Sequence, residues 1–166
     1  MLRKFLVLFL IVLLAGCGSP KKTKYQGVEA DNNYVEKGMK FLSQGDVLKA
    51  IKNFDMAIKN DPNNIKNYLT LAQVYIRLKN YPRAIDTLSA ATRVDPINGD
   101  VYYLLSVSQR LNGDLKGAID SAKKSVVLFQ RSGDQDNFSR SAGVLKKLMQ
   151  EAQQFQSRAD EAPTQP

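Results

Sequence analysis

The sequence predicts an all-α fold: a helical-repeat solenoid of three helix pairs plus a C-terminal capping helix, preceded by a signal peptide and a flexible tether. Two observations predict this fold. Ala50, Ala84 and Ala118 lie 34 residues apart, and each is followed by Ile. After Gly133, apolar side chains continue at helical spacing without a second helix to pair with. A period of this length is typical of arrays of helix pairs, which need a cap at their end.

The composition excludes several kinds of chemistry. The chain has 166 residues and a net charge of +8, with no His and one Cys. Without His there is no Ser-His-Asp triad and no imidazole metal site, and one Cys cannot form an internal disulfide or a thiolate metal cluster. The lysines are scattered rather than interleaved with aromatic side chains, which argues against nucleic-acid binding. We therefore expect no enzyme activity, no cofactor, no metal and no nucleic-acid partner.

The first residues are predicted to form a secretory signal. Arg3 and Lys4 precede eleven apolar residues, Phe5 to Ala15. This run is shorter than the about 20 residues that a transmembrane helix needs, and it fits the apolar region of a signal peptide.

The segment Leu14-Ala15-Gly16-Cys17 resembles the lipobox of bacterial lipoproteins, in which the Cys thiol receives a diacylglyceryl group and the signal is cut before the Cys. The resemblance implies that residues 1–16 are removed and that lipidated Cys17 anchors the chain to a membrane of the cell envelope. The alternative is a plain signal peptide, or an N-terminal anchor with an incidental Cys. Gly18 stands where Asp would signal inner-membrane retention, so the resemblance favours the outer membrane, facing the periplasm. In a cell with a single membrane, the same signal implies its outer leaflet.

Residues 17–31 are predicted to hold the lipidated Cys and a tether. The segment is polar and has no apolar period, and Pro20 and Gly27 interrupt regular structure. Its three lysines would either touch anionic headgroups or be solvated.

Other positions recur with the same period as the repeated Ala. They are Tyr34, Tyr68 and Tyr102 upstream, the small residues Gly38, Ala72 and Ser106, and Pro62 and Pro96 downstream. This pattern resembles the tetratricopeptide repeat. The resemblance covers a repeat domain at 32–132 in three units, 31–64, 65–98 and 99–132. With the lipobox, the chain is similar to bacterial tetratricopeptide-repeat lipoproteins.

Helix signals agree with this period. We expect helices at 34–44, 47–60, 65–78, 82–94, 99–112 and 115–130. The small repeated residues would let the two helices of each unit approach closely. Asn33 and Glu36 fit a capping box, Asp46 and Asp114 fit N-caps that follow glycine, and Pro82 fits the first turn of a helix.

The segment 133–158 is predicted to be the capping helix. Val144, Leu145, Leu148 and Phe155 recur near helical spacing in it. The last unit of a solenoid must cover its apolar face, which gives this helix its role. Residues 159–166 are expected to form a disordered tail.

In tetratricopeptide repeats the first helix of each unit lines a concave surface, so the resemblance implies a peptide-binding groove. The candidate residues are Val35, Met39, Leu42, Lys66, Leu69, Gln73, Ile76, Arg77, Tyr103, Val107 and Arg110. An apolar lining with Arg suits a helix or extended peptide that carries an acidic residue. Val35 and Met39 stand where members with a clamp for peptide C-termini have Lys and Asn. The alternative is that part of this stripe, above all in the third unit, packs against the capping helix or the tether.

These observations lead to the hypothesis of a lipid-anchored adaptor that holds a protein or peptide partner at the cell envelope. It resembles lipoproteins that serve as assembly factors for pili and secretion pores, or as scaffolds for cell-wall enzymes. The alternative function is a structural component that self-associates into an envelope complex.

Overall fold

The computed structural model describes residues 33–161, and all regular structure in that range is α-helical. The expectations for the signal peptide at 1–16, for Cys17 and for the tether lie outside the described residues. Residues 162–166 lie outside them as well.

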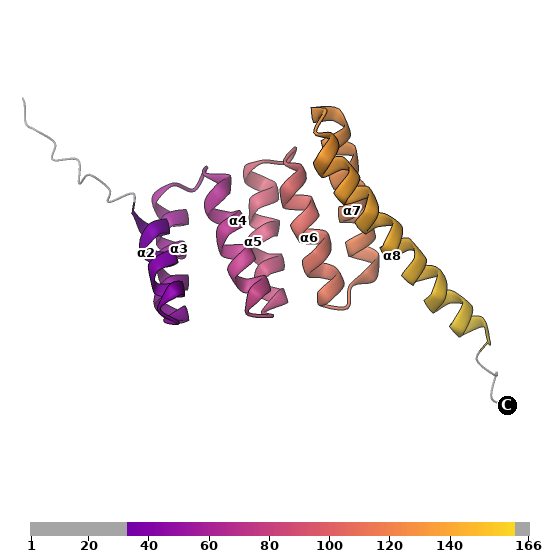
Figure 1. The fold of residues 1–166 in the computed structure, drawn as a ribbon, viewed down its shortest axis with the longest axis horizontal. Helices are drawn as coiled ribbons and strands as arrows, with labels where there is room; N and C mark the ends of the chain where they lie inside the picture. The colour runs from indigo at the N-terminus through magenta and orange to yellow at the C-terminus, as the bar shows by residue number, and fades with distance from the viewer. Residues whose placement is uncertain (1–32, 162–166) are drawn as a thin grey trace, which may run out of the picture. The chain divides into compact units, whose positions relative to one another are not determined.

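The described helices form pairs that follow one another along the chain. They are α2 (Tyr34–Ser43), α3 (Val47–Asn60), α4 (Ile65–Arg77), α5 (Tyr81–Val94), α6 (Gly99–Leu111), α7 (Leu115–Ser132) and α8 (Gln135–Glu161). The pairs α2/α3, α4/α5 and α6/α7 stand side by side in chain order, and α8 packs against α7 (Figure 1). The predicted solenoid of three helix pairs and a final helix is confirmed.

Local side chains set most of the helix starts. The carboxylates of Asp46 and Asp114 accept hydrogen bonds from the backbone N–H of Lys49 (3.1 Å) and Gly117 (2.8 Å). Hydrogen bonds from the ammonium and then the backbone N–H of Lys49 hold the pKa of Asp46 below its ordinary value. The glycine before each cap has a positive φ, as at Gly45 (φ 78), which lets the chain turn sharply between paired helices.

The predicted capping box at the start of α2 is wrong. Asn33 makes no side-chain cap hydrogen bond, and its buried Oδ1 has no partner among the described residues. Its ψ of 12° departs from the extended conformation that points an N-cap side chain back at the helix N–H groups. The first helix therefore starts without the local support that α3, α4, α5, α6 and α7 have.

Close approach between paired helices forms the core. Ala50, Ala84 and Ala118 are all 0% exposed on the second helices. In the first unit, a Cβ on Gly38 would lie 2.7 Å from the ring of Phe54, so the ring packs directly on the α2 backbone. The repeated small residues therefore fill the role that the sequence pattern assigns to them.

The last interface uses hydroxyl groups where the earlier ones use apolar contacts. Ser125 Oγ on α7 bonds the carbonyl of Gly99 at 2.9 Å and lies 2.9 Å from Ser141 Oγ on α8. A hydroxyl has one proton, so when Ser125 donates to Gly99, Ser141 donates to Ser125. This buried chain of hydrogen bonds connects α6, α7 and α8.

The capping helix is longer than predicted. It begins at Gln135 rather than 133, because Gly133 ends α7 in the left-handed conformation (φ 73) and Asp134 caps α8 by accepting from the Asn137 N–H. That backbone hydrogen bond lowers the pKa of Asp134 most strongly. The helix ends at Glu161 rather than 158, so it includes the first residues of the segment 159–166 that we expected to be a tail. Within residues 33–161, no helix combines the length and apolar character that crossing a bilayer requires.

We expect Gly38→Ala to lower the melting temperature of the full chain. In a helix interior, Gly→Ala gains about 1 kcal/mol of propensity. At Gly38 the added methyl group meets the Phe54 ring, and such overpacking costs about 1–3 kcal/mol. Gly143→Ala is the matched control, since a Cβ there meets nothing within 4 Å, and it should raise the melting temperature. Thermal unfolding followed by circular dichroism tests both, and a stabilised Gly38→Ala would contradict the close packing.

Candidate functional site

The predicted groove residues lie on the first helices of the three units, α2, α4 and α6. They fall into two groups by exposure. Met39, Lys66, Gln73, Arg77 and Arg110 are exposed, and Val35, Leu42, Leu69, Ile76, Tyr103 and Val107 are half-buried. The stripe is therefore a half-buried apolar band edged by exposed polar side chains.

The middle of this stripe is hollowed. A hollow of about 430 Å³ lies between α4 and α6, and we call it the central hollow. Its lining residues are Gln73, Ile76 and Arg77 on α4, and Tyr103, Leu104 and Val107 on α6. All of them except Leu104 were predicted. Leu104 packs partly against the buried cluster around Leu88, and its repeat position gave no reason to include it.

The central hollow combines apolar walls with one cation. Ile76 and Val107 supply aliphatic surface, and Tyr103 supplies an aromatic ring. Arg77 is exposed, and within the described residues no hydrogen bond or ion pair engages its guanidinium. A guanidinium in this position can form two parallel hydrogen bonds to a carboxylate, while its apolar neighbours bind a side chain.

Several predicted residues also belong to the core. Val35, Leu42 and Ile76 pack against the buried cluster that contains Phe54, and Leu69 packs against the cluster that contains Leu88. An amphipathic helix buries a stripe at least about 100° wide, so residues at the margin of the groove are shared with the interior. Truncating Leu69 would therefore change stability as well as binding, which makes it a poor probe of the groove.

The capping helix α8 contacts two of the predicted groove residues in the third unit, Tyr103 and Arg110. Glu151 Oε2 on α8 lies 2.5 Å from Arg110 Nε. Arg140 lies over the ring of Tyr103, 4.7 Å from its centroid, and 3.8 Å from a carboxylate oxygen of Asp100. Arg110, which we expected to be available to a ligand, is thus already paired. Of the two readings for the third unit, the structure shows packing against α8 at Tyr103 and Arg110.

The first unit presents a different surface. Val35 lines a polar hollow of about 270 Å³ with Tyr34 and the side chains of Asn60, Asn64 and Asn67. Asn67 is buried and donates from Nδ2 to the carbonyl of Ala57 at 3.0 Å, which ties α4 to the end of α3. Met39 is 51% exposed on α2. This end of the stripe is therefore amide-rich and lacks the cation of the central hollow.

The central hollow offers groups that can bind a ligand by apolar contact and by hydrogen bonds. Among residues 33–161, no group of three or more His, Cys, Asp or Glu side chains could hold a metal ion. The groups that line the central hollow are aliphatic, aromatic, amide and guanidinium groups. Such a set binds peptide segments by apolar burial and charge-assisted hydrogen bonds.

Comparison with known proteins agrees with the repeat pattern. Residues 41–107 match the family profile described as tetratricopeptide repeat. Among curated proteins, the chain is similar to BBSome complex member BBS4 of Bos taurus, with 29% identity over 93 residues that cover 56% of this chain and 18% of that protein. The chain thus spans less than a fifth of the length of this relative.

Solved structures share the fold. One is the first repeat domain of Spaghetti (RPAP3) bound to the HSP90 peptide SRMEEVD, with a TM-score of 0.61 and 22% identity, covering 72% of this chain and 90% of that one. Another is PcrH in complex with the chaperone binding region of PopD, with a TM-score of 0.65 and 17% identity, covering 72% and 91%. Residues 41–107 therefore match the tetratricopeptide repeat, and the likeness to the solved structures shows the fold. Tetratricopeptide repeats are typically protein-interaction modules rather than enzymes.

We expect apolar burial against α7, more than the ion pair to Arg110 on α6, to hold α8 in place. Leu148 is 4% exposed in the cluster with Ala118 and Ala122, so Leu148→Ala should cost about 2–5 kcal/mol. The Arg110 and Glu151 side chains are 45% and 26% exposed, so Glu151→Gln should cost at most about 1 kcal/mol. Thermal unfolding of both variants shows whether apolar burial or the ion pair contributes more. Equal losses would mean that the ion pair carries the attachment.

Proposed function

We propose that this tetratricopeptide-repeat protein is a lipid-anchored adaptor of the bacterial cell envelope, which binds a segment of a partner protein in the central hollow. The observation that carries the proposal is the exposed Arg77, which has no partner among the described residues and lies beside Ile76, Tyr103 and Val107. A binding site for an apolar anchor next to an acidic side chain needs this combination.

The ligands of the similar structures support a peptide as the partner segment. The RPAP3 domain is bound to SRMEEVD, a peptide with two adjacent glutamates, and PcrH is bound to a region of PopD. For this chain we propose a segment with at least one carboxylate for Arg77 and apolar side chains for the walls of the hollow. Val35 and Met39 replace the Lys and Asn of a carboxylate clamp, so the carboxylate comes from a side chain rather than from a peptide C-terminus.

The capping helix limits where this segment lies. Glu151 occupies Arg110, and Arg140 lies over Tyr103, so the third unit offers less of its surface than the second. A carboxylate that approached Arg110 would meet the charge of Glu151, whereas Arg77 meets no such competitor in the described chain. Partner recognition therefore centres on α4.

The membrane location rests on the N-terminal sequence. The lipobox places the lipid on Cys17, and residues 18–31 provide a tether of about a dozen residues between the lipid and the repeats. The two acyl chains of a diacylglyceryl group hold a protein on a membrane, since each buried CH₂ contributes about 0.8 kcal/mol. We propose an outer-membrane lipoprotein facing the periplasm, acting as an assembly or scaffold factor for a pilus, secretion or cell-wall complex.

Photo-crosslinking in cells tests the groove. A photo-reactive residue replacing Gln73, in the central hollow, should give an adduct with a partner protein, and the same residue replacing Lys52, exposed on α3, should give none. Arg77→Ala should reduce the adduct about tenfold or more, because truncation of an interface anchor costs about 2 kcal/mol or more. Arg93→Ala, exposed on α5, is the charge-matched control.

The other outcomes are equally informative. An adduct formed solely with a second copy of the chain would support the self-associating structural component instead. Adducts of equal yield at positions 73 and 52 would place the partner on the outside of the repeats. Lys124 is unsuitable as a control, because its Nζ lies 2.6 Å from the hydroxyl of Tyr102 and 4.2 Å from the ring centroid.

Cys17→Ser should abolish lipid attachment and leave an uncleaved or soluble form, because the thiol is the acceptor of the diacylglyceryl group. Metabolic labelling with a radioactive fatty acid, followed by membrane fractionation, measures both effects. Label retained in the variant would exclude the lipobox, while the groove hypothesis would be unaffected.

A further inference from the structure

Helix α8 stands in the position of the first helix of a fourth unit, and no described helix follows it as a second. Within the described chain, α2, α4 and α6 each pack against the helix that follows them, α3, α5 and α7. Helix α8 packs against α7 on one side, and no described helix follows it. A unit of a solenoid contacts its neighbours alone, so this edge exposes surface that a further helix would cover in a longer array.

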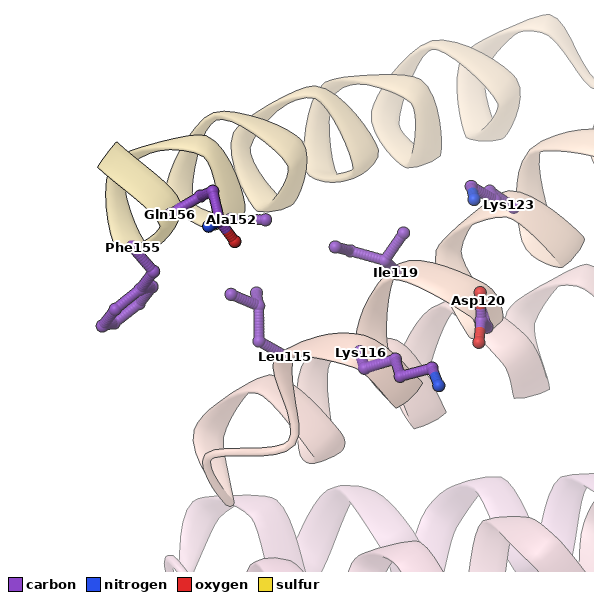
Figure 2. A pocket seen from close by; sticks show the side chains of 8 residues that line it. All are labelled: Leu115, Lys116, Ile119, Asp120, Lys123, Ala152, Phe155 and Gln156. Carbon is purple, nitrogen blue, oxygen red and sulfur yellow. The ribbon is translucent and has the colours of Figure 1, made fainter. Parts of the chain in front are cut away.

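That edge contains a slot between two helices. The slot has a volume of about 520 Å³ and lies between the first turns of α7 and the last turns of α8 (Figure 2). Leu115 and Ile119 point toward α8, and Phe155 extends from α8 toward the start of α7 (Figure 2). Phe155 is seven residues after Leu148, on the same face of α8, yet it is 57% exposed where Leu148 is 4% exposed. The apolar face of α8 therefore continues past the part that α7 covers.

Lysines border this slot on the α7 side. Lys116 and Lys123 line it with Asp120 between them, and all three are exposed. No hydrogen bond or ion pair within residues 33–161 engages either ammonium group. The two lysines are seven residues apart, which is two helical turns or about 10.5 Å along α7.

We propose that this slot binds an amphipathic helix of a partner protein, which packs on α8 where no described helix follows it. Its apolar stripe covers Phe155, Ile119 and Leu115, and two carboxylates seven residues apart bind Lys116 and Lys123. The residue between those carboxylates is uncharged or basic, because it faces Asp120. This site is separate from the central hollow, so the adaptor has two binding surfaces.

The same charges argue against other occupants. In the tether, three lysines outnumber Glu29 and Asp31, so it would bring like charge to the slot. A second copy of the chain that docked slot to slot would place lysines against lysines. A flat membrane surface reaches the edge of Phe155 but not the floor formed by Ile119 and Ala152 between two helices. A helix with an acidic edge meets both the shape and the charge.

Binding of a defined peptide to the lipidated full chain in nanodiscs tests the proposal. The probe is a fluorescent helical peptide of about 18 residues, with Leu at helical spacing and two Glu seven residues apart. Its matched control has Gln at both positions. We expect the Glu peptide to bind at least about tenfold more tightly than the Gln peptide, measured by fluorescence anisotropy.

Variants assign the binding to the slot. Phe155→Ala, and separately the pair Lys116→Glu and Lys123→Glu, should each weaken the Glu peptide about tenfold or more. The controls are Met149→Ala, another exposed apolar residue of α8, and the pair Lys52→Glu and Lys146→Glu, exposed outside the slot. These controls should change the affinity for the peptide less than about twofold, as should Arg77→Ala. The test of the slot is therefore independent of whether the central hollow binds a partner.

Three results would overturn the proposal. The first is equal or absent binding of the two peptides to the unmodified protein. The second is loss of binding to anionic vesicles in Phe155→Ala, with peptide binding unchanged, which would assign Phe155 to a lipid surface. The third is a dimer, seen by analytical ultracentrifugation, that Phe155→Ala dissociates, which would make a second copy the occupant.

Discussion

The rest of the structure depends on the close approach of paired helices at small residues. A Cβ on Gly38 would lie 2.7 Å from the Phe54 ring, and Ala50, Ala84 and Ala118 have no exposed surface. Because every unit uses the same kind of contact, successive units adopt the same orientation, and their first helices come to lie side by side. The central hollow between α4 and α6 is a consequence of that regular spacing, although none of the residues that set the spacing lines it.

The regular pattern ends at the interface between α7 and α8. There Ser125 connects the carbonyl of Gly99 to Ser141, so buried hydroxyl groups join three helices where earlier units use apolar side chains. Such a network is directional, and it orients α8 as well as attaching it. One edge of α8 then reaches Tyr103 and Arg110 on the side of the predicted groove, while the other diverges from α7 beside Phe155. The way α8 packs on α7 therefore covers part of the predicted groove at Tyr103 and Arg110, and it leaves the slot beside Phe155 open.

The binding surfaces that we propose consist of exposed side chains rather than of the repeated ones. The repeated Ala and small residues are buried, as are Tyr68 and Tyr102. Arg77, Lys116 and Lys123 lie outside those repeat positions and supply the charges that a partner would meet. The net charge of +8 points in the same direction, because it favours acidic partners and raises their rate of association.

The sequence by itself determined the elements that depend on near neighbours in the chain. The period predicted six helices to within two residues at each end, and local side chains such as Asp46 and Asp114 cap them as expected, because capping bonds span three residues. The resemblance to the tetratricopeptide repeat implied most of the lining of the central hollow. Asn33 failed as a cap because its backbone conformation was not predictable from its identity. The tertiary structure alone decided that Arg110 binds Glu151, that Lys124 binds Tyr102, and that Phe155 stays exposed while Leu148 is buried. The outcomes at Arg110 and Phe155 depend on the angle at which α8 crosses α7, and α8 lies outside the repeat, so no period in the sequence encodes that angle.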